Sequence, residues 1–317
     1  QNRIPLHARG AGSGLAGESL GRGIVLDFSR YMRRILAVGA DQVRVQAGVV
    51  HGELNRMLAR SGRTFGPDPA MTNVTTMGGV VSVDAGGSHW LKYGSARAHV
   101  RSMKVVLTDG EVLEAARHPV IDDPRRYESP RLRQIVTTVA SLIERYREGI
   151  EQFRPQSLVN RSGYALDRVL ADGQLDLAKL IVGSEGTLGL ISEITLATQT
   201  LPAARGAVLL VFDSLDKAAR AVQEIVLLEP SACDLMDRRH LSIARETDVR
   251  YELLIPGAAE AVLLVEFFAG DAASLQDKLA QVVDLVQYES GLAAGSHIAH
   301  DEDENELFWR LSQRFVP

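Results

Sequence analysis

The order of apolar and polar positions in the first part of the chain predicts short strands and amphipathic helices. Apolar or β-branched runs predict strands at Gly23–Phe28 and Val43–Ala47. The segment Val50–Arg60 places its apolar side chains on one face of a helix. Met103–Leu107 and Glu111–Leu113 flank an Asp-Gly pair, which predicts a β-hairpin.

Further along, the apolar spacing of Leu132–Ile143 predicts an amphipathic helix that ends at Gly149. Leu180–Val182 and Leu190–Leu196 are predicted strands on either side of the glycine turn Gly183–Gly189. These elements together favour an α+β fold for the first part of the chain.

The pattern changes after Pro202–Arg205, which we interpret as a boundary. Ala207–Val211 and Ala261–Val265 both read AVLLV, and predicted helices follow near residues 215–228 and 274–286. Two similar strand–helix units predict a ferredoxin-like α+β layer, with chance similarity of two apolar strands as the alternative. We therefore expect one domain over residues 1–204 and a second over residues 205–317.

Composition and charge narrow the class of protein. The chain has 317 residues, which is enough for two domains with cores of their own. Its net charge of -5 argues against a nucleic-acid partner, because phosphate binding needs a basic face. No apolar run approaches the length of a transmembrane segment. The single cysteine, Cys233, excludes an internal disulfide or iron–sulfur site and favours a cytoplasmic location, with peripheral contact at the inner face of the membrane left open.

A glycine-rich segment near the start, Arg9–Gly17, reads RGAGSGLAG and matches the pattern GxGxxG. A dinucleotide fold of the Rossmann type would need a helix directly after it. Gly21 and Gly23 would break such a helix, and a strand begins at Ile24, so we expect no parallel βαβ unit here. Consecutive small residues still favour a nest of backbone N–H groups that binds phosphate.

Three later segments add to this loop. Phe65–Ala70 reads FGPDPA, Thr75–Gly94 reads TTMGGVVSVDAGGSHWLKYG, and Gly183–Glu193 reads GSEGTLGLISE. Together with Pro5–Gly17, they resemble FAD-binding proteins of the vanillyl-alcohol oxidase, or PCMH, type, in the glycolate oxidase and D-lactate dehydrogenase branch. Several members of this branch are fused to an iron–sulfur half. The resemblance covers nearly the whole chain and is thinner after residue 200.

The resemblance implies a PCMH-type FAD-binding domain followed by a cap domain, with FAD held noncovalently because Gly10–Gly14 contains no histidine. It places the pyrophosphate at Arg9, Gly10, Ala11, Gly12, Ser13 and Gly14. It assigns a second flavin-binding stretch to Pro67, Asp68, Thr75, Gly78, Gly79, Ala85 and Gly86. It assigns the adenosine side to Glu185, Gly186, Leu190 and Ile191, and it places Asn160 and Tyr164 near the flavin. The alternative for any one glycine is a tight turn.

The implied reaction is the oxidation of a small 2-hydroxy acid, such as D-lactate or glycolate, with electrons passing to an iron–sulfur, quinone or cytochrome acceptor. His89, Lys92 and Tyr93, in the turn GSHWLKYG, are the candidate catalytic residues. A structural hydrogen bond in a crowded loop is the alternative for His89.

Several positions depart from the family pattern. Val83 and Asp84 stand where relatives carry Glu-Asn, and Ser312 stands where relatives carry a substrate-binding Arg between Trp309 and Pro317. The histidine-rich motif that supplies a base and a metal site in relatives is absent before Pro317. Because the chain also begins at Gln1 rather than Met, we expect a fragment truncated at both ends.

His297 and His300 precede an acidic run that imitates a metal cluster. Helical spacing from Glu304 to Leu311 favours instead a solvated acidic helix start, so we predict no metal site.

Two other functions stay open. One is a different enzyme on the same scaffold, such as an alcohol oxidase or an ether-lipid synthase. The other is a flavin-binding module that relays electrons without catalysis of its own.

Overall fold

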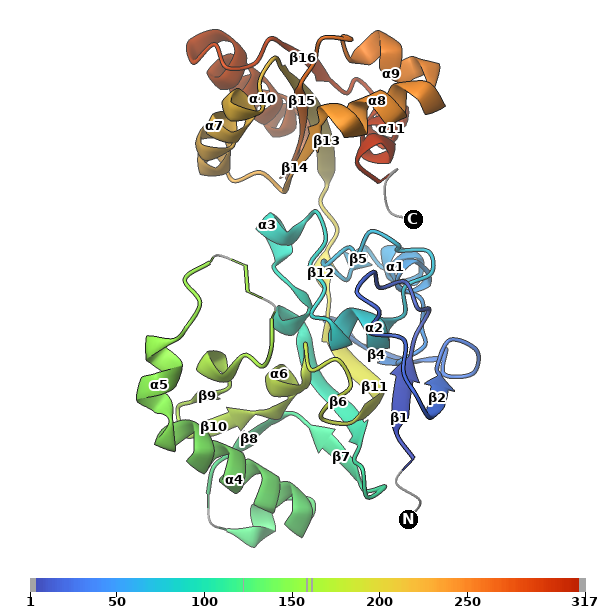
Figure 1. Cartoon of the computed structure of the whole chain (residues 1–317), viewed down its shortest axis with the longest axis vertical. Coiled ribbons are helices and arrows are strands. Elements are labelled where there is room, and N and C mark those ends of the chain that lie inside the picture. The colour runs from blue at the N-terminus through green and yellow to red at the C-terminus, as the bar shows by residue number, and fades with distance from the viewer. Residues whose placement is uncertain (1–3, 122, 158, 161, 314–317) are drawn as a thin grey trace. The chain divides into compact units, whose positions relative to one another are not determined.

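The computed structural model of the chain describes residues 4–121, 123–157, 159–160 and 162–313 (Figure 1). It divides into two compact units. The first contains the chain up to Ala85 together with Ser95–Thr200, and the second contains Gly86–Gly94 and the chain from Leu201 onward. We predict a domain boundary after residue 204; in the structure, the first compact unit ends at Thr200.

The first unit is built on a five-stranded antiparallel sheet. Its strand order is β3 (Ile35–Val38), β4 (Gln42–Gln46), β11 (Leu190–Ala197), β6 (Val100–Val106) and β7 (Val112–Ala115). In β4, β6, β7 and β11 the buried residues largely alternate with less buried ones, as expected where one sheet face covers a core and the other meets solvent. The predicted hairpin is confirmed, because β6 and β7 pair antiparallel across the Asp-Gly turn.

Helices and short strands complete the first unit. The helices are α1 (His51–Ala59), α2 (Met77–Ser82), α4 (Pro130–Arg145), α5 (Arg147–Gln152) and α6 (Leu177–Ile181). The short strands are β5 (Arg63–Thr64), β8 (Arg117–Pro119), β9 (Leu170–Ala171), β10 (Gln174–Asp176) and β12 (Gln199–Thr200).

Two sequence predictions in this unit are wrong. The helix expected to end at Gly149 ends at Arg145, and Gly149 lies inside the following helix α5. The strand expected at Leu180–Val182 is mostly helix α6. The Asp176 side chain accepts a hydrogen bond from Lys179 N at 2.9 Å and so caps this helix, whereas a short apolar run alone does not distinguish helix from strand.

The strands that flank the first glycine loop form a parallel pair that is not a βαβ unit. β1 (Leu6–Arg9) and β2 (Ile24–Asp27) pair in parallel, in register from Leu6 opposite Ile24. As expected, no helix lies between them. The loop Gly10–Gly23 is long enough to return the chain by itself, and Gly12, Gly17 and Gly23 adopt positive φ angles within it.

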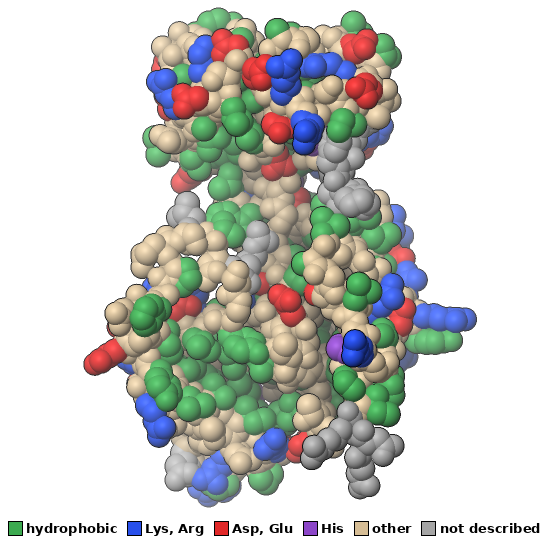
Figure 2. All heavy atoms as spheres, viewed as in Figure 1, with side chains coloured by type: hydrophobic (Ala, Val, Ile, Leu, Met, Phe, Trp, Pro, Cys, Tyr) green, Lys and Arg blue, Asp and Glu red, His purple; other side chains and the backbone are tan. Residues whose placement is uncertain are grey.

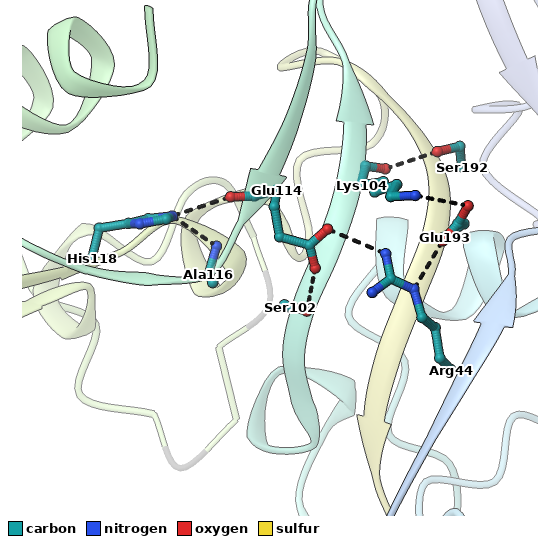
Figure 3. Close-up of polar contacts among 8 residues, drawn as sticks. All are labelled: Arg44, Ser102, Lys104, Glu114, Ala116, His118, Ser192 and Glu193. Atoms are coloured by element: carbon teal, nitrogen blue, oxygen red, sulfur yellow. Dashed lines mark hydrogen bonds and ion pairs between the residues drawn. The ribbon is translucent and has the colours of Figure 1, made fainter. Parts of the chain in front are cut away.

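The outer face of the five-stranded sheet carries a network of charged side chains (Figure 3). Arg44 on β4 donates to Glu193 on β11 at 2.8 Å and to Glu114 on β7 at 3.2 Å. Lys104 on β6 also donates to Glu193, at 3.3 Å. Partial burial, the largest influence, would raise the pKa of Glu193, but hydrogen bonds from Arg44 and Lys104 and their charges lower it overall.

This network predicts a loss of stability in acid. Because folding lowers the pKa of Glu193, its contribution is present above the ordinary value of 4.5 and is lost as pH falls toward the folded value. We expect Glu193→Gln to cost about 1 kcal/mol at pH 7 and to reduce the slope of stability against pH below 4.5. Urea unfolding of both proteins between pH 3 and pH 7 measures this, and parallel pH profiles would contradict it.

The second unit has a four-stranded antiparallel sheet. Its order is β14 (Ala232–Asp237), β15 (Ala261–Ala269), β13 (Ala204–Phe212) and β16 (Gly295–Ile298). In chain order this is 2-3-1-4, the order of a ferredoxin-like sheet, and the predicted ferredoxin-like layer is confirmed.

Helices cover both faces of this sheet. α7 (Leu215–Ile225) and α10 (Ala272–Val283) pack on one face of the sheet, against Val208 of β13 and Leu263 of β15. The other face is covered by α8 (Arg238–Thr247), α9 (Val249–Leu254) and α11 (Glu302–Gln313). The short helix α3 (Trp90–Tyr93) also belongs to this unit. Basic and acidic side chains lie interspersed on the face of this unit seen in Figure 2.

Candidate functional site

The first loop, Arg9–Gly14, follows β1 and has unused backbone donors. Among the described residues, none accepts a hydrogen bond from the backbone N–H groups of residues 10–14. Gly12 has φ +68°, and a Cβ there would lie 3.1 Å from Nη2 of Arg9, so the guanidinium lies against the loop. Unpaired N–H groups beside a guanidinium form an arrangement suited to an anion such as a pyrophosphate.

The second loop, Phe65–Ala85, lies directly against the first. Ser13 Oγ and Thr75 Oγ1 are 3.1 Å apart and share a hydrogen bond. A Cβ on Gly10 would lie 2.2 Å from Oγ1 of Thr76, which caps α2 by accepting a hydrogen bond from Gly79 N. The first loop therefore rests on the N-terminal end of α2, and only glycine fits at position 10.

Gly78 has a packing role of its own. Its N–H donates to Ala47 O at 2.7 Å, and a Cβ on it would lie 2.9 Å from Cβ of Ala47. This close approach to the chain after β4 requires glycine whether or not a ligand is bound. Gly79 has more room, since its nearest neighbour would be Oγ1 of Thr76 at 3.4 Å.

The third loop, Gly183–Gly189, meets the other end of α2. Gly183 N donates to Val81 O and Glu185 N donates to Ser82 O, both at 3.0 Å. Glu185 and Gly186 are exposed with φ angles of +51° and +79°. The structure thus brings the loops that carry Gly12 and Gly186 to the two ends of the short helix α2, which itself contains Gly79.

The predicted residues after and beside the third loop divide in two groups. Leu190 and Ile191 begin β11 and pair with β6, so their backbone is part of the sheet. Tyr164 is exposed, and its hydroxyl is 2.8 Å from Oγ1 of Thr187 in the third loop. Asn160 is exposed and accepts a hydrogen bond from Ser162 N.

A buried ion pair joins the second and third loops, and the sequence did not reveal it. Asp84, with φ +51° and 2% exposure, accepts hydrogen bonds from Arg97 N at 2.9 Å and Arg97 Nε at 3.0 Å. Arg97 Nη2 donates to Val182 O at 2.8 Å, just before the third loop. The only sequence signal for this pair was the departure from the family pattern at Val83 and Asp84. Nothing in the sequence pointed to Arg97 as the partner.

His51, at the start of α1, is a second residue that sequence reasoning missed. Its Nε2 donates to Pro67 O at 2.9 Å, and its Nδ1 is 2.5 Å from Oγ1 of Thr72. These bonds hold the predicted flavin residues Pro67 and Asp68 in the second loop. Burial, the largest influence, lowers the pKa of His51 below 6.5 despite the Pro67 carbonyl and the Asp68 charge, which act in the opposite direction.

The second loop should therefore loosen in mild acid. Since folding lowers the pKa of His51, its neutral form stabilises the fold above pH 6.5, and this contribution is lost as pH falls below 6.5 toward the folded value. We expect His51→Gln, which can still donate to Pro67 O, to remove this part of the pH dependence. Amide exchange of a peptide over residues 65–75 at pH 7.5 and pH 5.5 measures it; an equal pH response in both proteins would contradict it.

The candidate catalytic residues lie in the segment that the structure groups with the second unit. Within that segment, Gly86 is buried and Lys92 is exposed. His89 Nε2 is 2.5 Å from Oε2 of Glu266, and the Tyr93 ring lies 6.4 Å from the His89 ring. The alternative role of His89 was a structural hydrogen bond. Glu266 is a specific partner for such a bond, and the sequence did not indicate it.

The remaining candidates lie at the end of the second unit. Ser312, at the position of the family's Arg, donates to Oδ2 of Asp234 at 2.6 Å. Glu304 accepts a hydrogen bond from His300 N, and Asp301 accepts one from Glu304 N. These acids cap the start of α11, as expected for a solvated acidic helix start. Pro317 lies outside the described residues.

Among the described residues, no helix is both long and apolar enough to cross a bilayer.

Comparison with known proteins adds independent information. Residues 1–116 match the family model described as an FAD binding domain, and residues 201–317 match the C-terminal domain of FAD linked oxidases. A D-2-hydroxyglutarate dehydrogenase of Pantoea ananatis is 32% identical over 97% of this chain and 32% of its own length. The glycolate oxidase subunit GlcD of Escherichia coli K12 is 29% identical over 99% of this chain and 53% of its own length.

The chain thus spans about a third to a half of the length of these relatives. A solved structure of an alkyldihydroxyacetonephosphate synthase matches 98% of this chain and 51% of that one with a TM-score of 0.64, at 20% identity, which shows the fold alone. With an FAD binding domain and the C-terminal domain of FAD linked oxidases, the chain belongs to the PCMH-type FAD-dependent oxidoreductases.

Proposed function

We propose that this chain is the flavin-binding part of a dehydrogenase of small 2-hydroxy acids. The observation that carries the proposal is the meeting of three glycine-bearing loops around α2, with unused N–H donors in the first. Relatives named as D-2-hydroxyglutarate dehydrogenase, glycolate oxidase subunit and D-lactate dehydrogenase support the substrate class.

The residues present fit a noncovalently held FAD. The N–H groups of residues 10–14 and the Arg9 guanidinium would bind its two phosphates. A side chain at Gly10 would collide with Thr76, so the close backbone approach needed there exists only with glycine. When bound, the flavin supplies the acceptor for the hydride that leaves the α-carbon of the substrate.

Thr75, Pro67 and Asp68, held by Ser13 and His51, would line the second stretch of the cofactor. The third loop at Glu185 and Gly186 would contact the adenosine side. His89, Lys92 and Tyr93 stay candidates for contact with the substrate, whose hydroxyl proton must pass to a base during the oxidation.

We further propose that the electrons pass to an iron–sulfur domain or subunit, with a quinone or cytochrome as the other acceptors to be tested. The relative named as a subunit of glycolate oxidase supports an assembly with partners. A cytoplasmic location with peripheral contact at the inner face of the membrane belongs to the same proposal.

Anaerobic reduction of the flavin in the full-length protein tests the function. We expect bleaching of the flavin absorbance near 450 nm by at least one of D-lactate, glycolate and D-2-hydroxyglutarate, and none by simple alcohols. Bleaching by alcohols alone would favour the alcohol-oxidase alternative. Bleaching by none of these compounds would favour the electron-relay module.

A further inference from the structure

The segment Gly86–Gly94, called here the 86–94 segment, leaves the first unit and returns to it at one place. Its base is closed by Ala96 N, which donates to Ala85 O at 2.8 Å. Arg97 N donates to the Asp84 carboxylate directly beside this bond, at 2.9 Å. A short excursion with adjacent ends has the form of an Ω-loop, whose position depends on what its own side chains contact.

Side chains of the 86–94 segment bind two carboxyl groups of the second unit. Ser88 Oγ donates to Oδ2 of Asp234 at 2.6 Å, and His89 Nε2 lies 2.5 Å from Oε2 of Glu266. Asp234 also accepts a hydrogen bond from Ser312, so both acids receive donors from distant parts of the chain. The segment is thereby attached to β14 and β15 at neighbouring points.

Glu266 is an unusual residue for its position. It is 0% exposed and lies within β15, whose sequence AVLLVEFFA is otherwise apolar. Burying a carboxyl group costs free energy unless donors satisfy its oxygens. Trp309 Nε1 donates to Oε1 at 2.9 Å, and His89 meets Oε2. An apolar side chain at this position would be buried at no such cost. We therefore interpret Glu266 as a residue that binds specific donors, namely His89 and Trp309, rather than as a packing residue.

The His89 ring is also held by aromatic contacts. It stacks with Trp309 at a centroid distance of 5.0 Å and an interplanar angle of 27°. It stacks with Phe268 at 5.4 Å and 19°. Because Trp309 both donates to Glu266 and stacks on His89, the imidazole, the indole and the carboxyl group form one rigid group.

We propose that Glu266 is a positioning residue that fixes the 86–94 segment through His89, and with it the other two candidate catalytic residues, Lys92 and Tyr93. The catalytic role of these residues rests on the proposed function. The attachment of the segment itself rests only on the contacts above.

The test compares amide hydrogen exchange of the 86–94 segment in the whole chain, with and without added FAD. We expect Glu266→Gln and His89→Ala to speed exchange of this segment by about tenfold or more, while core peptides of β13 and β15 stay unchanged. His89→Gln keeps a donor to Glu266 and should stay close to the unchanged protein. Glu260→Gln, which alters a partly exposed acid just before β15, is the matched control.

The flavin circular dichroism of the loaded protein gives the second readout. It should change in Glu266→Gln and His89→Ala and be restored in His89→Gln. Unchanged exchange of the 86–94 segment in Glu266→Gln would overturn the proposal, as would faster exchange throughout the second unit, which would mean a purely structural role. If the unchanged chain binds no FAD, the proposed function fails, but the exchange comparison still decides whether Glu266 holds the segment.

Discussion

Replacing Arg97 with methionine should destabilise the first unit by about 3–5 kcal/mol, because it leaves the Asp84 carboxylate buried without its charged partner. The substitution also removes the donor to Val182 O, which holds the start of the third loop. FAD affinity should therefore fall together with stability. Urea unfolding and FAD titration of the same protein measure both effects.

Two further variants separate the charge from general damage. The double change Asp84→Asn with Arg97→Met removes the buried charge, and Asn tolerates the positive φ at position 84, so a large part of the stability should return. Arg125→Met breaks only the exposed pair with Asp123 and should change stability by less than about 0.5 kcal/mol. Equal losses in the Arg97 and Arg125 variants would show that the buried pair has no special role.

Replacing Gly10 with alanine should weaken FAD binding by about tenfold to a hundredfold, or about 1.4–2.8 kcal/mol. The new Cβ would lie 2.2 Å from Oγ1 of Thr76, so either the first loop or the cap of α2 must move. Loss of a threonine cap alone costs about 1 kcal/mol, and displacement of the N–H groups adds to it. Titration of the apoprotein with FAD measures the change.

A second substitution tests whether the collision is the cause. Thr76→Ala removes the obstructing oxygen, so adding it to Gly10→Ala should cost less than the sum of the two single changes. Gly149→Ala is the control, since nothing lies within 4 Å of a Cβ there and its φ is not positive. Strictly additive losses of FAD affinity would contradict the proposed contact between the first loop and α2.

Elements with strong local signals were predicted well from the sequence. The Asp109-Gly110 pair correctly predicted the hairpin of β6 and β7, and the apolar run Ala207–Val211 lies in a strand as expected. Elements with weak local signals were predicted wrongly. Leu180–Val182 was expected to be a strand, but the helix cap at Asp176 favours helix there. The chain Arg238–Leu254 gave no prediction, although it forms α8 and α9.

Most residues of the candidate site were predicted from the family resemblance. The contacts between the loops that carry them became visible only in the structure. The parallel pairing of β1 with β2 was not predicted, because the sequence indicated only that no crossover helix follows the first loop. The partners Arg97 and Glu266 lie far in sequence from Val182 and His89, respectively. Such pairs depend on tertiary packing, which leaves no periodic or spacing signal in one sequence.

The most direct test of the account is titration of the apoprotein with FAD, followed by denaturation of the complex. If the loops at Gly12, Gly79 and Gly186 form one binding site, the chain will take up one FAD with quenching of flavin fluorescence and will release it unmodified when unfolded. A chain that stays colourless after reconstitution, or whose FAD affinity is the same in Gly10→Ala, would contradict a flavin site at these loops.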